Sequence, residues 1–272
     1  MFPLTADGSL MLALEDDFTY VLRKALTGNG LTPAEAAFRA EVPESDARSF
    51  LAGTFSPTTA RKFASVLGLN AEAYARHALY LPEPPELSGI ARLDLPMGGE
   101  QVNAWLVCDD DACALFDAGY EPGDLLEAIR SHRRRLPDRA FITHAHRDHI
   151  GALDQLLANG MPVHAAGIAA TIHICPGDTV ICGPLAIRAC DLSGHATPAL
   201  GYHIGGLSQP VLVTGDALFA GSIGGCATPA IYQHALCRLR EVLAPLPNNT
   251  VLLPGHGPAT TLGQERAANP FL

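Results

Sequence analysis

The chain has 272 residues, 48% of them hydrophobic, and a formal net charge of -10. This length and composition can fill the core of one large or two smaller domains, so a disordered chain is excluded. Nucleic acids and anionic membranes bind surfaces rich in Lys and Arg, so the acidic balance disfavours both and favours a small-molecule substrate as the partner.

Targeting signals are not expected at the N-terminus. Residues Met1 to Asp7 lack the basic start and apolar core of a signal peptide, and no apolar run reaches the ~18 residues of a membrane span. We therefore expect a cytoplasmic protein. The seven cysteines are irregularly spaced and form no CxxC pair, which favours reduced thiols. Cys108 and Cys113 bracket an acidic turn, and we interpret them as buried thiols rather than a pair across a hairpin.

Residues 1–80 have the apolar spacing of short helices. Five helices are predicted, with starts at Asp17, Thr32, Glu44, Ser56 and Asn70. Thr32 is followed by a proline and by Glu35, which is the pattern of a capping box. The prolines that follow Leu81 forbid helix and favour extended chain, so we predict a linker over residues 81–89.

From Ile90 onward the pattern changes to strands. Residues 102–107 and 114–117 predict a hairpin, and residues 122–135 predict a helix with a solvated arginine run at its end. Further strands are predicted over 179–187, 200–204, 211–214 and 250–253, with a helix over 230–243 and a short closing helix. Two groups of strands, each followed by helices, indicate two packed sheets with helices outside, in a domain over residues 90–272.

The motif His144-x-His146-x-Asp148-His149 is the most specific feature of the chain. It lies between the strand-like run 139–142 and the helical pattern 150–157. A turn there can direct the first two histidines to one side and Asp148 and His149 to the other, which suits two adjacent metal ions rather than one closed site. Imidazole and carboxylate ligands favour an open hydrolytic or redox-active centre over a structural zinc.

Three more candidate ligands, His195, Asp216 and His256, each follow a glycine in a turn after an apolar run. Glycine permits the close backbone approach that brings separate strand ends together. Five histidines and two aspartates are then available for two ions. The remaining histidines lack this context and are interpreted as surface or core residues, with His203 the one nearest to a candidate ligand loop: His77, His132, His164, His173, His203 and His234.

These motifs, together with Leu115-Phe116-Asp117-Ala118-Gly119, resemble the metallo-β-lactamase fold in order and spacing over residues 90–272. The resemblance implies an α/β fold, an αββα sandwich, here preceded by a small all-α domain. It implies a first metal held by His144, His146 and His195, a second held by Asp148, His149 and His256, Asp216 bridging both, and Asp117 hydrogen-bonded close to the ligands.

The stretch from Gly215 to Gly224 and the ending Gly255-His256-Gly257-Pro258 look like those of hydroxyacylglutathione hydrolases, the glyoxalase II group. This similarity implies a hydroxide that bridges two divalent ions and cleaves a thioester or small ester, with Asp148 and Asp216 orienting it. Zinc is the first expectation, with iron and manganese as alternatives. Gly225 and Cys226 occupy the position at which glyoxalase II enzymes have a lysine or arginine for the glutathione carboxylate. The resemblance therefore does not identify the thiol part of the substrate.

Three other functions are alternatives to this hydrolase. Persulfide dioxygenases have a similar ligand pattern around a single iron, whereas β-lactamases are exported and are disfavoured here.

The helix order over residues 18–69 resembles a helix-turn-helix domain of phage-repressor type, which would make the chain a ligand-sensing regulator. However, residues 1–90 carry 11 acidic and 7 basic side chains, and only Arg48 is basic around the third helix. We therefore expect this domain to pack on the metal domain or on a second copy, forming a homo-oligomer, rather than on DNA.

Overall fold

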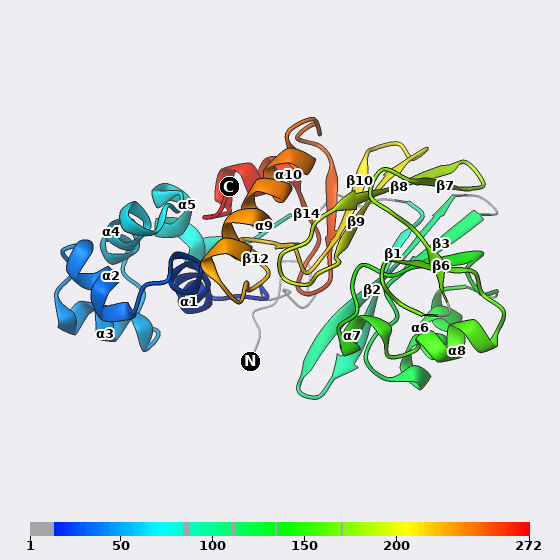
Figure 1. Ribbon diagram of the computed structural model, residues 1–272, viewed down its shortest axis with the longest axis horizontal. Helices are drawn as coiled ribbons and strands as arrows, with labels where there is room; N and C mark the ends of the chain where they lie inside the picture. The colour runs from blue at the N-terminus through cyan, green and yellow to red at the C-terminus, as the bar shows by residue number, and fades with distance from the viewer. Residues whose placement is uncertain (1–13, 84–87, 110–111, 134, 170) are drawn as a thin grey trace.

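The computed structural model describes residues 14–83, 88–109, 112–133, 135–169 and 171–272. Its N-terminal part is helical, as predicted (Figure 1). The elements are α1 (Phe18–Asn29), α2 (Pro33–Arg39), α3 (Glu44–Leu51), α4 (Pro57–Leu67), α5 (Ala71–Arg76) and the 3-10 helix η1 (His77–Leu79). We call residues 14–80 the helical module.

Side chains at the helix ends explain these boundaries. Thr32 and Glu35 form the predicted capping box, in which each side chain bonds the backbone N–H of the other residue. The Asn70 side chain accepts from the backbone N–H of Ala73 at the start of α5. Gly30 and Gly68 end α1 and α4 in the left-handed conformation, which glycine adopts without steric cost.

From Ile90 onward, the described residues form two six-stranded sheets and a two-stranded ribbon. The first sheet runs β1 (Ile90–Met97), β2 (Glu100–Asp109), β3 (Ala112–Phe116), β4 (Arg139–Phe141), β5 (Val163–Ala165) and β6 (Ile172–His173). The second runs β14 (Thr260–Thr261), β13 (Val251–Pro254), β10 (Val211–Gly215), β9 (Leu200–Gly205), β8 (Leu185–Asp191) and β7 (Thr179–Cys182). The ribbon pairs β11 (Leu218–Phe219) with β12 (Ser222–Ile223).

Helices cover the outer faces of both sheets (Figure 1). They are α6 (Pro122–His132), α7 (Arg147–Ile150) and α8 (Leu153–Ala158) on the first sheet, and α9 (Pro229–Leu243) and α10 (Leu262–Ala268) on the second. Trp105, Phe116 and Phe141 of the first sheet share one core with Tyr202 and Val213 of the second, so the two sheets pack face to face. This arrangement is the predicted αββα sandwich.

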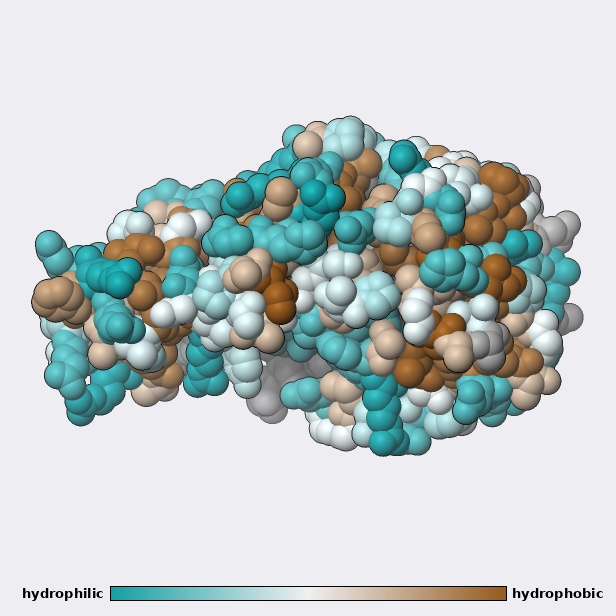
Figure 2. All heavy atoms as spheres, in the orientation of Figure 1, coloured by the Kyte–Doolittle hydropathy of each residue, from teal (hydrophilic) through white to brown (hydrophobic). Residues whose placement is uncertain are grey.

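The helical module packs on the outer side of the second sheet. One continuous core joins Phe18, Leu22 and Phe50 of the module to Tyr232 of α9 and to Phe271. Figure 2 shows hydrophilic and hydrophobic residues interspersed on one face of the module. The predicted packing of the module on the metal domain is therefore present. None of the helices in the described part of the chain is long and apolar enough to span a membrane.

Three predicted elements need correction. The helix predicted over 122–135 ends at His132, because Arg133 is extended, and Arg134 lies outside the described residues. The strand predicted over 179–187 is the hairpin of β7 and β8, which turns at Gly183 with a φ of 57°. The helical pattern 150–157 is divided between α7 and α8. Residues 84–87 of the predicted linker, and the acidic residues 110 and 111, also lie outside the described residues.

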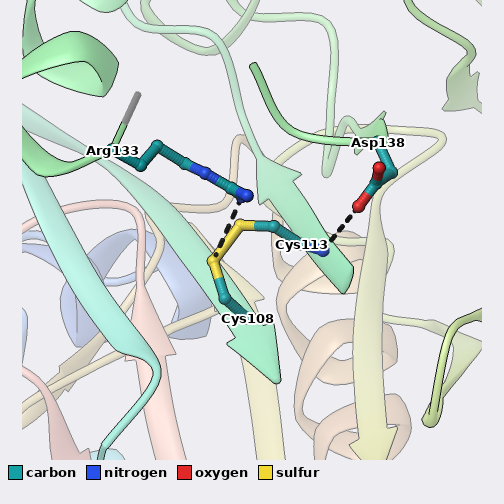
Figure 3. The surroundings of a disulfide bond; sticks show 4 residues. All are labelled: Cys108, Cys113, Arg133 and Asp138. Atoms are coloured by element: carbon teal, nitrogen blue, oxygen red, sulfur yellow. Dashed lines mark hydrogen bonds between the residues drawn. A yellow bond between two sulfur atoms is a disulfide. The ribbon is translucent and has the colours of Figure 1, made fainter. Parts of the chain in front are cut away.

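The expectation of free thiols at Cys108 and Cys113 was wrong. The two cysteines face each other across the hairpin of β2 and β3 and form a disulfide (Figure 3). The Arg133 guanidinium donates to the Cys108 sulfur at 3.4 Å, and the backbone N–H of Cys113 donates to the Asp138 carboxylate at 2.7 Å. The register of the hairpin explains the pair, because directly opposed residues bring their Cβ atoms close together.

Candidate metal centre

The turn after β4 places the histidine motif at the carboxyl end of this strand in the first sheet. Asp117 anchors this turn: it accepts from the Thr143 backbone N–H at 2.8 Å and from the Thr143 hydroxyl at 2.9 Å. His144 follows directly, and His146 is the residue before α7. Asp148 then falls within the short helix. The strand-to-helix turn predicted from the sequence is therefore present.

The other three candidates come from the second sheet. Asp216 follows β10 and His256 follows β13, and these neighbouring strands are parallel, so their carboxyl ends meet at the same edge. His195 lies in the loop between β8 and β9. A side chain at Gly255 would overlap the Asp216 carboxylate, so glycine at this position lets the two strand ends converge.

The structure brings all seven candidates together in two groups that share Asp216. Within each group, one ligand atom from every residue lies within 4.8 Å of the others. The first group is His144, His146, His195 and Asp216, and the second is Asp148, His149, Asp216 and His256. Imidazole nitrogens of His146 approach those of His144 and His195 at 3.0 and 3.1 Å. Such convergence of nitrogen atoms is typical of ligands around a cation.

Hydrogen bonds on the far side of the rings orient three of the histidines. Nδ1 of His149 bonds the Asp117 carboxylate at 2.8 Å. Nδ1 of His195 bonds the Gly225 carbonyl, and Nδ1 of His256 bonds the Gln101 carbonyl, both at 2.9 Å. Because these oxygen atoms only accept, each Nδ1 carries the proton and Nε2 faces the centre. This is the tautomer that a metal-binding histidine needs.

Burial and charge in this centre shift the pKa of its members in opposite directions. Burial and the neighbouring His149 lower the pKa of His144 to about 3. Burial also opposes protonation of His256, but its hydrogen bond with Asp148 and the charge of Asp216 outweigh this and raise its pKa to about 9. Burial would raise the pKa of Asp216, yet the surrounding imidazoles, His149 first, hold it well below the usual value. The carboxylate is therefore ionised and attracts positive charge.

Two buried atoms at the middle of the centre have no hydrogen-bond partner among the described residues. They are Nε2 of His149 and Oδ1 of Asp216, which lie 3.3 Å apart without hydrogen-bond geometry. An unpartnered buried polar group costs about 1–3 kcal/mol, so such atoms are rare in folded proteins. A cation between them would satisfy both. The nitrogen and carboxylate donors present here suit divalent zinc, iron or manganese.

The remaining histidines lie elsewhere. His77 is buried and its Nε2 donates to the Gly221 carbonyl at 3.0 Å, where the helical module meets the ribbon. His164 stacks on Phe141. His203 pairs with Arg188 across β8 and β9 and belongs to neither ligand group. Although His203 is close to His195 in the sequence, it is not one of the residues that converge in the centre.

Sequence reasoning missed the part of the helical module that borders this centre. The backbone of Glu15 lies against Gly257, the residue after His256, and Lys24 lies beside the loop that contacts His195. Neither residue belongs to a recognisable sequence motif, and both are far from the ligands in the sequence. The sequence predicted only the start of α1 at Asp17, whose side chain caps the helix.

Comparisons with known proteins agree with this geometry. Residues 97–179 match the metallo-beta-lactamase superfamily. A probable metallo-hydrolase of Bacillus subtilis (strain 168), YqgX, is 31% identical over 204 residues, covering 65% of this chain and 95% of the relative. The hydroxyacylglutathione hydrolase GloC of Haemophilus influenzae is 30% identical over 208 residues, covering 65% of this chain and 96% of the relative. The chain therefore belongs to the metallo-beta-lactamase superfamily and is a metal-dependent hydrolase of that fold.

A solved structure shares the arrangement. The protein TTHA1623, solved in a di-iron-bound form, is 28% identical and superposes with a TM-score of 0.55, covering 66% of this chain and 99% of that one. The predicted metallo-β-lactamase-like sandwich is thus confirmed. The helix-turn-helix character of the helical module stays a prediction.

Proposed function

We propose that the two ligand groups hold a pair of divalent cations and that the enzyme hydrolyses a thioester or a related small ester. The observation that carries this proposal is Asp216, which belongs to both groups, while three further donors complete each group. A shared carboxylate of this kind suits two neighbouring ions better than one. The similarity to a hydroxyacylglutathione hydrolase supports thioesters as the substrate class.

The residues of the centre have distinct roles in this proposal. Such a pair of cations, when bound, supplies a water of lowered pKa and polarises the carbonyl group under attack. Asp216 Oδ2 lies 3.6 Å from Nε2 of both His195 and His256, so its carboxylate is central enough to orient that water. Asp148 does the same from the second group. His146 is exposed, and we infer that the substrate enters on its side.

Zinc remains our first choice of metal, with iron or manganese as alternatives. Imidazole and carboxylate donors accept all three, and the di-iron-bound form of TTHA1623 supports iron. A persulfide dioxygenase would use one iron with two histidines and one aspartate. The second group, Asp148, His149, His256 and Asp216, has donors for another ion that a single-iron scheme would leave unused, and this supports the hydrolase.

The thiol part of the substrate is inferred from the loop at Gly225. Lys24 lies beside this position, with its Cε 3.9 Å from where a Cβ on Gly225 would stand. However, Asp16 forms an ion pair with Lys24 and neutralises it. We infer that glutathione thioesters are poor substrates, because Lys24, the cation beside Gly225, is already paired with Asp16 and is not available to the glycyl carboxylate. Wild-type kcat/KM for S-D-lactoylglutathione should stay below ~10⁷ M⁻¹s⁻¹, within the range of ordinary enzymes.

The test combines metal analysis with a substrate panel, using protein purified without a histidine tag. We expect close to two metal ions per chain and hydrolysis of at least one thioester or lactone. Asp216→Ala should lower the metal content and reduce kcat/KM about 10³-fold, equivalent to ~4 kcal/mol of transition-state stabilisation. Full activity in this variant would contradict the proposal that Asp216 is a ligand shared by two metal ions. One iron per chain, with oxygen consumed in the presence of a persulfide, would instead identify a dioxygenase.

A further inference from the structure

Lys24 of α1 reaches from the helical module to the end of β12 and lies beside the loop that follows it. Its Nζ donates to the Ile223 carbonyl at 2.8 Å and forms an ion pair with Asp16. The same ammonium lies 5.1 Å from the centre of the Phe219 ring. The side chains of Lys24 and Asp16 are only 17% and 5% exposed. Contacts with the Ile223 carbonyl, the Asp16 carboxylate and the Phe219 ring therefore fix the position of the ammonium.

The loop that Lys24 contacts packs directly on two residues of the first ligand group. The Gly225 carbonyl bonds Nδ1 of His195 at 2.9 Å. A side chain at Gly224 would overlap the Asp216 carbonyl oxygen and stand 2.8 Å from the Cβ of His195. A shift of Gly224 toward Asp216 or His195 would therefore displace those two residues.

We propose that Lys24 is a positioning residue of the metal centre. By fixing the backbone at Ile223, it keeps the Gly225 carbonyl where it holds His195 in the Nδ1–H tautomer, with Nε2 facing the other ligands. The inference rests on the proposed function in one respect, namely that the first group binds a metal ion. The helical module thereby becomes part of the centre, because Lys24 and Asp16 both belong to it.

Asp16 determines how the variants must be designed. Removing Lys24 alone leaves a buried carboxylate without its partner, which is strongly destabilising in general. Lys24→Met is therefore paired with the double variant Asp16→Asn/Lys24→Met, which removes both charges together. Lys24→Arg keeps the charge. Lys62→Met is the matched control, because Lys62 also donates to a backbone carbonyl, that of Glu41, but on the exposed surface of the module.

The first measurement is zinc binding to the metal-free full-length protein, by competition with a chromophoric chelator. Changes to residues that orient metal ligands typically weaken binding 10–100-fold. We expect a loss of about that size in one of the two zinc-binding steps for Lys24→Met and for the double variant. Lys24→Arg should lose less, and Lys62→Met should bind as the wild type does. Wild-type affinity in both Lys24→Met variants would overturn the proposal.

A second measurement needs no metal. Imidazole ¹⁵N spectra of the metal-free protein should show His195 as the Nδ1–H tautomer in the wild type and in Lys62→Met, and as a mixture in both Lys24→Met variants. An unchanged His195 tautomer in those variants would also overturn the inference. If the wild type binds no zinc, the proposed function fails, and the tautomer then decides the role of Lys24 by itself. If the wild type binds zinc and the Lys24 variants match it in both measurements, only the inference about Lys24 fails.

Discussion

Asp117 is a buried residue that joins the turn after β4 to the second ligand group. Its carboxylate accepts from Thr143 and from Nδ1 of His149, and its backbone has a φ of 61°, which is uncommon outside glycine. Asparagine and aspartate both adopt this conformation more readily than most residues. The two side chains have the same shape, so the exchange keeps the packing while it removes the negative charge beside His149 and one hydrogen-bond acceptor.

We expect Asp117→Asn to fold normally but to bind zinc about 10–100-fold more weakly. The amide has a single acceptor oxygen and cannot bond Thr143 and His149 as the carboxylate does. Zinc competition on metal-free protein measures the effect. Asp154→Asn, on the exposed side of α8, is the control. Equal affinity in both variants would show that Asp117 does not orient the ligands.

Sequence reasoning reached the side chains of the centre but not their supports. Four of the seven candidates stand within six residues, and the other three follow glycines at strand ends, so their positions were predictable and the structure brings them together. That they bind metal stays a prediction. The supports of His195 and His256 are backbone carbonyls, which leave no trace in a sequence. Lys24 contacts a residue 199 positions away, and no local pattern predicts such a pair.

Among the elements, the loop after β12 offers a matched pair of substitutions. A methyl group on Gly224 would overlap the Asp216 carbonyl, whereas one on Gly225 would meet only Lys24, at 3.9 Å. Overpacking of this kind costs about 1–3 kcal/mol. We expect Gly224→Ala to lower both the free energy of unfolding, by that amount, and the zinc affinity, while Gly225→Ala stays close to the wild type. Chemical denaturation and zinc competition measure the two effects. Similar behaviour of the two variants would mean that the loop is free to move.

The contact of η1 with the ribbon predicts a pH dependence. Burial lowers the pKa of His77 below its ordinary value of 6.5, although its bond to the Gly221 carbonyl and the charge of Asp16 oppose the shift. The unfolded chain then binds more protons than the folded one. The contribution of neutral His77 to stability is therefore present above pH 6.5 and is lost as the pH falls below it.

We expect the melting temperature to fall less between about pH 7.5 and 5.5 in His77→Gln than in the wild type, because glutamine can donate to Gly221 without titrating. His132→Gln, at the exposed end of α6, should keep the wild-type dependence. Thermal melts of the metal-free proteins at the two pH values make the comparison. An equal fall in all three proteins would show that His77 does not control the contact.

Elements with strong local signals were predicted, including the hairpin of β2 and β3, whereas the shortest strands and the register of pairing were not. Capping at Thr32 and Asn70 marked helix starts that the structure contains. Strands β6, β11, β12 and β14 have two residues each, too few for any periodicity. The disulfide depends on the register of β2 against β3, which the spacing of Cys108 and Cys113 alone does not fix.

At the scale of the whole molecule, the helical module and the second sheet share one hydrophobic core. The sequence predicts a linker over 81–89, and part of it is fixed: Glu83 exchanges two hydrogen bonds with the Gln264 side chain. Tyr80 donates to the buried Glu265 at 2.5 Å. A shared core makes separate unfolding of the module unfavourable, because it would expose apolar surface on both sides.

We therefore expect a single cooperative transition in calorimetry of the full chain, with equal calorimetric and van't Hoff enthalpies. Zinc should raise the temperature of the whole transition, because a ligand that binds only the native state stabilises everything that unfolds with it. Two separate transitions, with only one of them shifted by zinc, would show that the module is an independent folding unit.

The contact between α5 and the segment after α10 has a consequence for folding during synthesis. The backbone N–H of Asn70 donates to the Pro270 carbonyl at 2.7 Å, and Phe271 belongs to the core of the module. About 200 residues separate these partners, which a ribosome translating 5–20 residues per second adds in roughly 10–40 s. The helical module is synthesised before the segment that completes its core. During that interval the apolar side chains that later contact Phe271 are exposed, so chaperones have a defined period in which to bind the nascent chain.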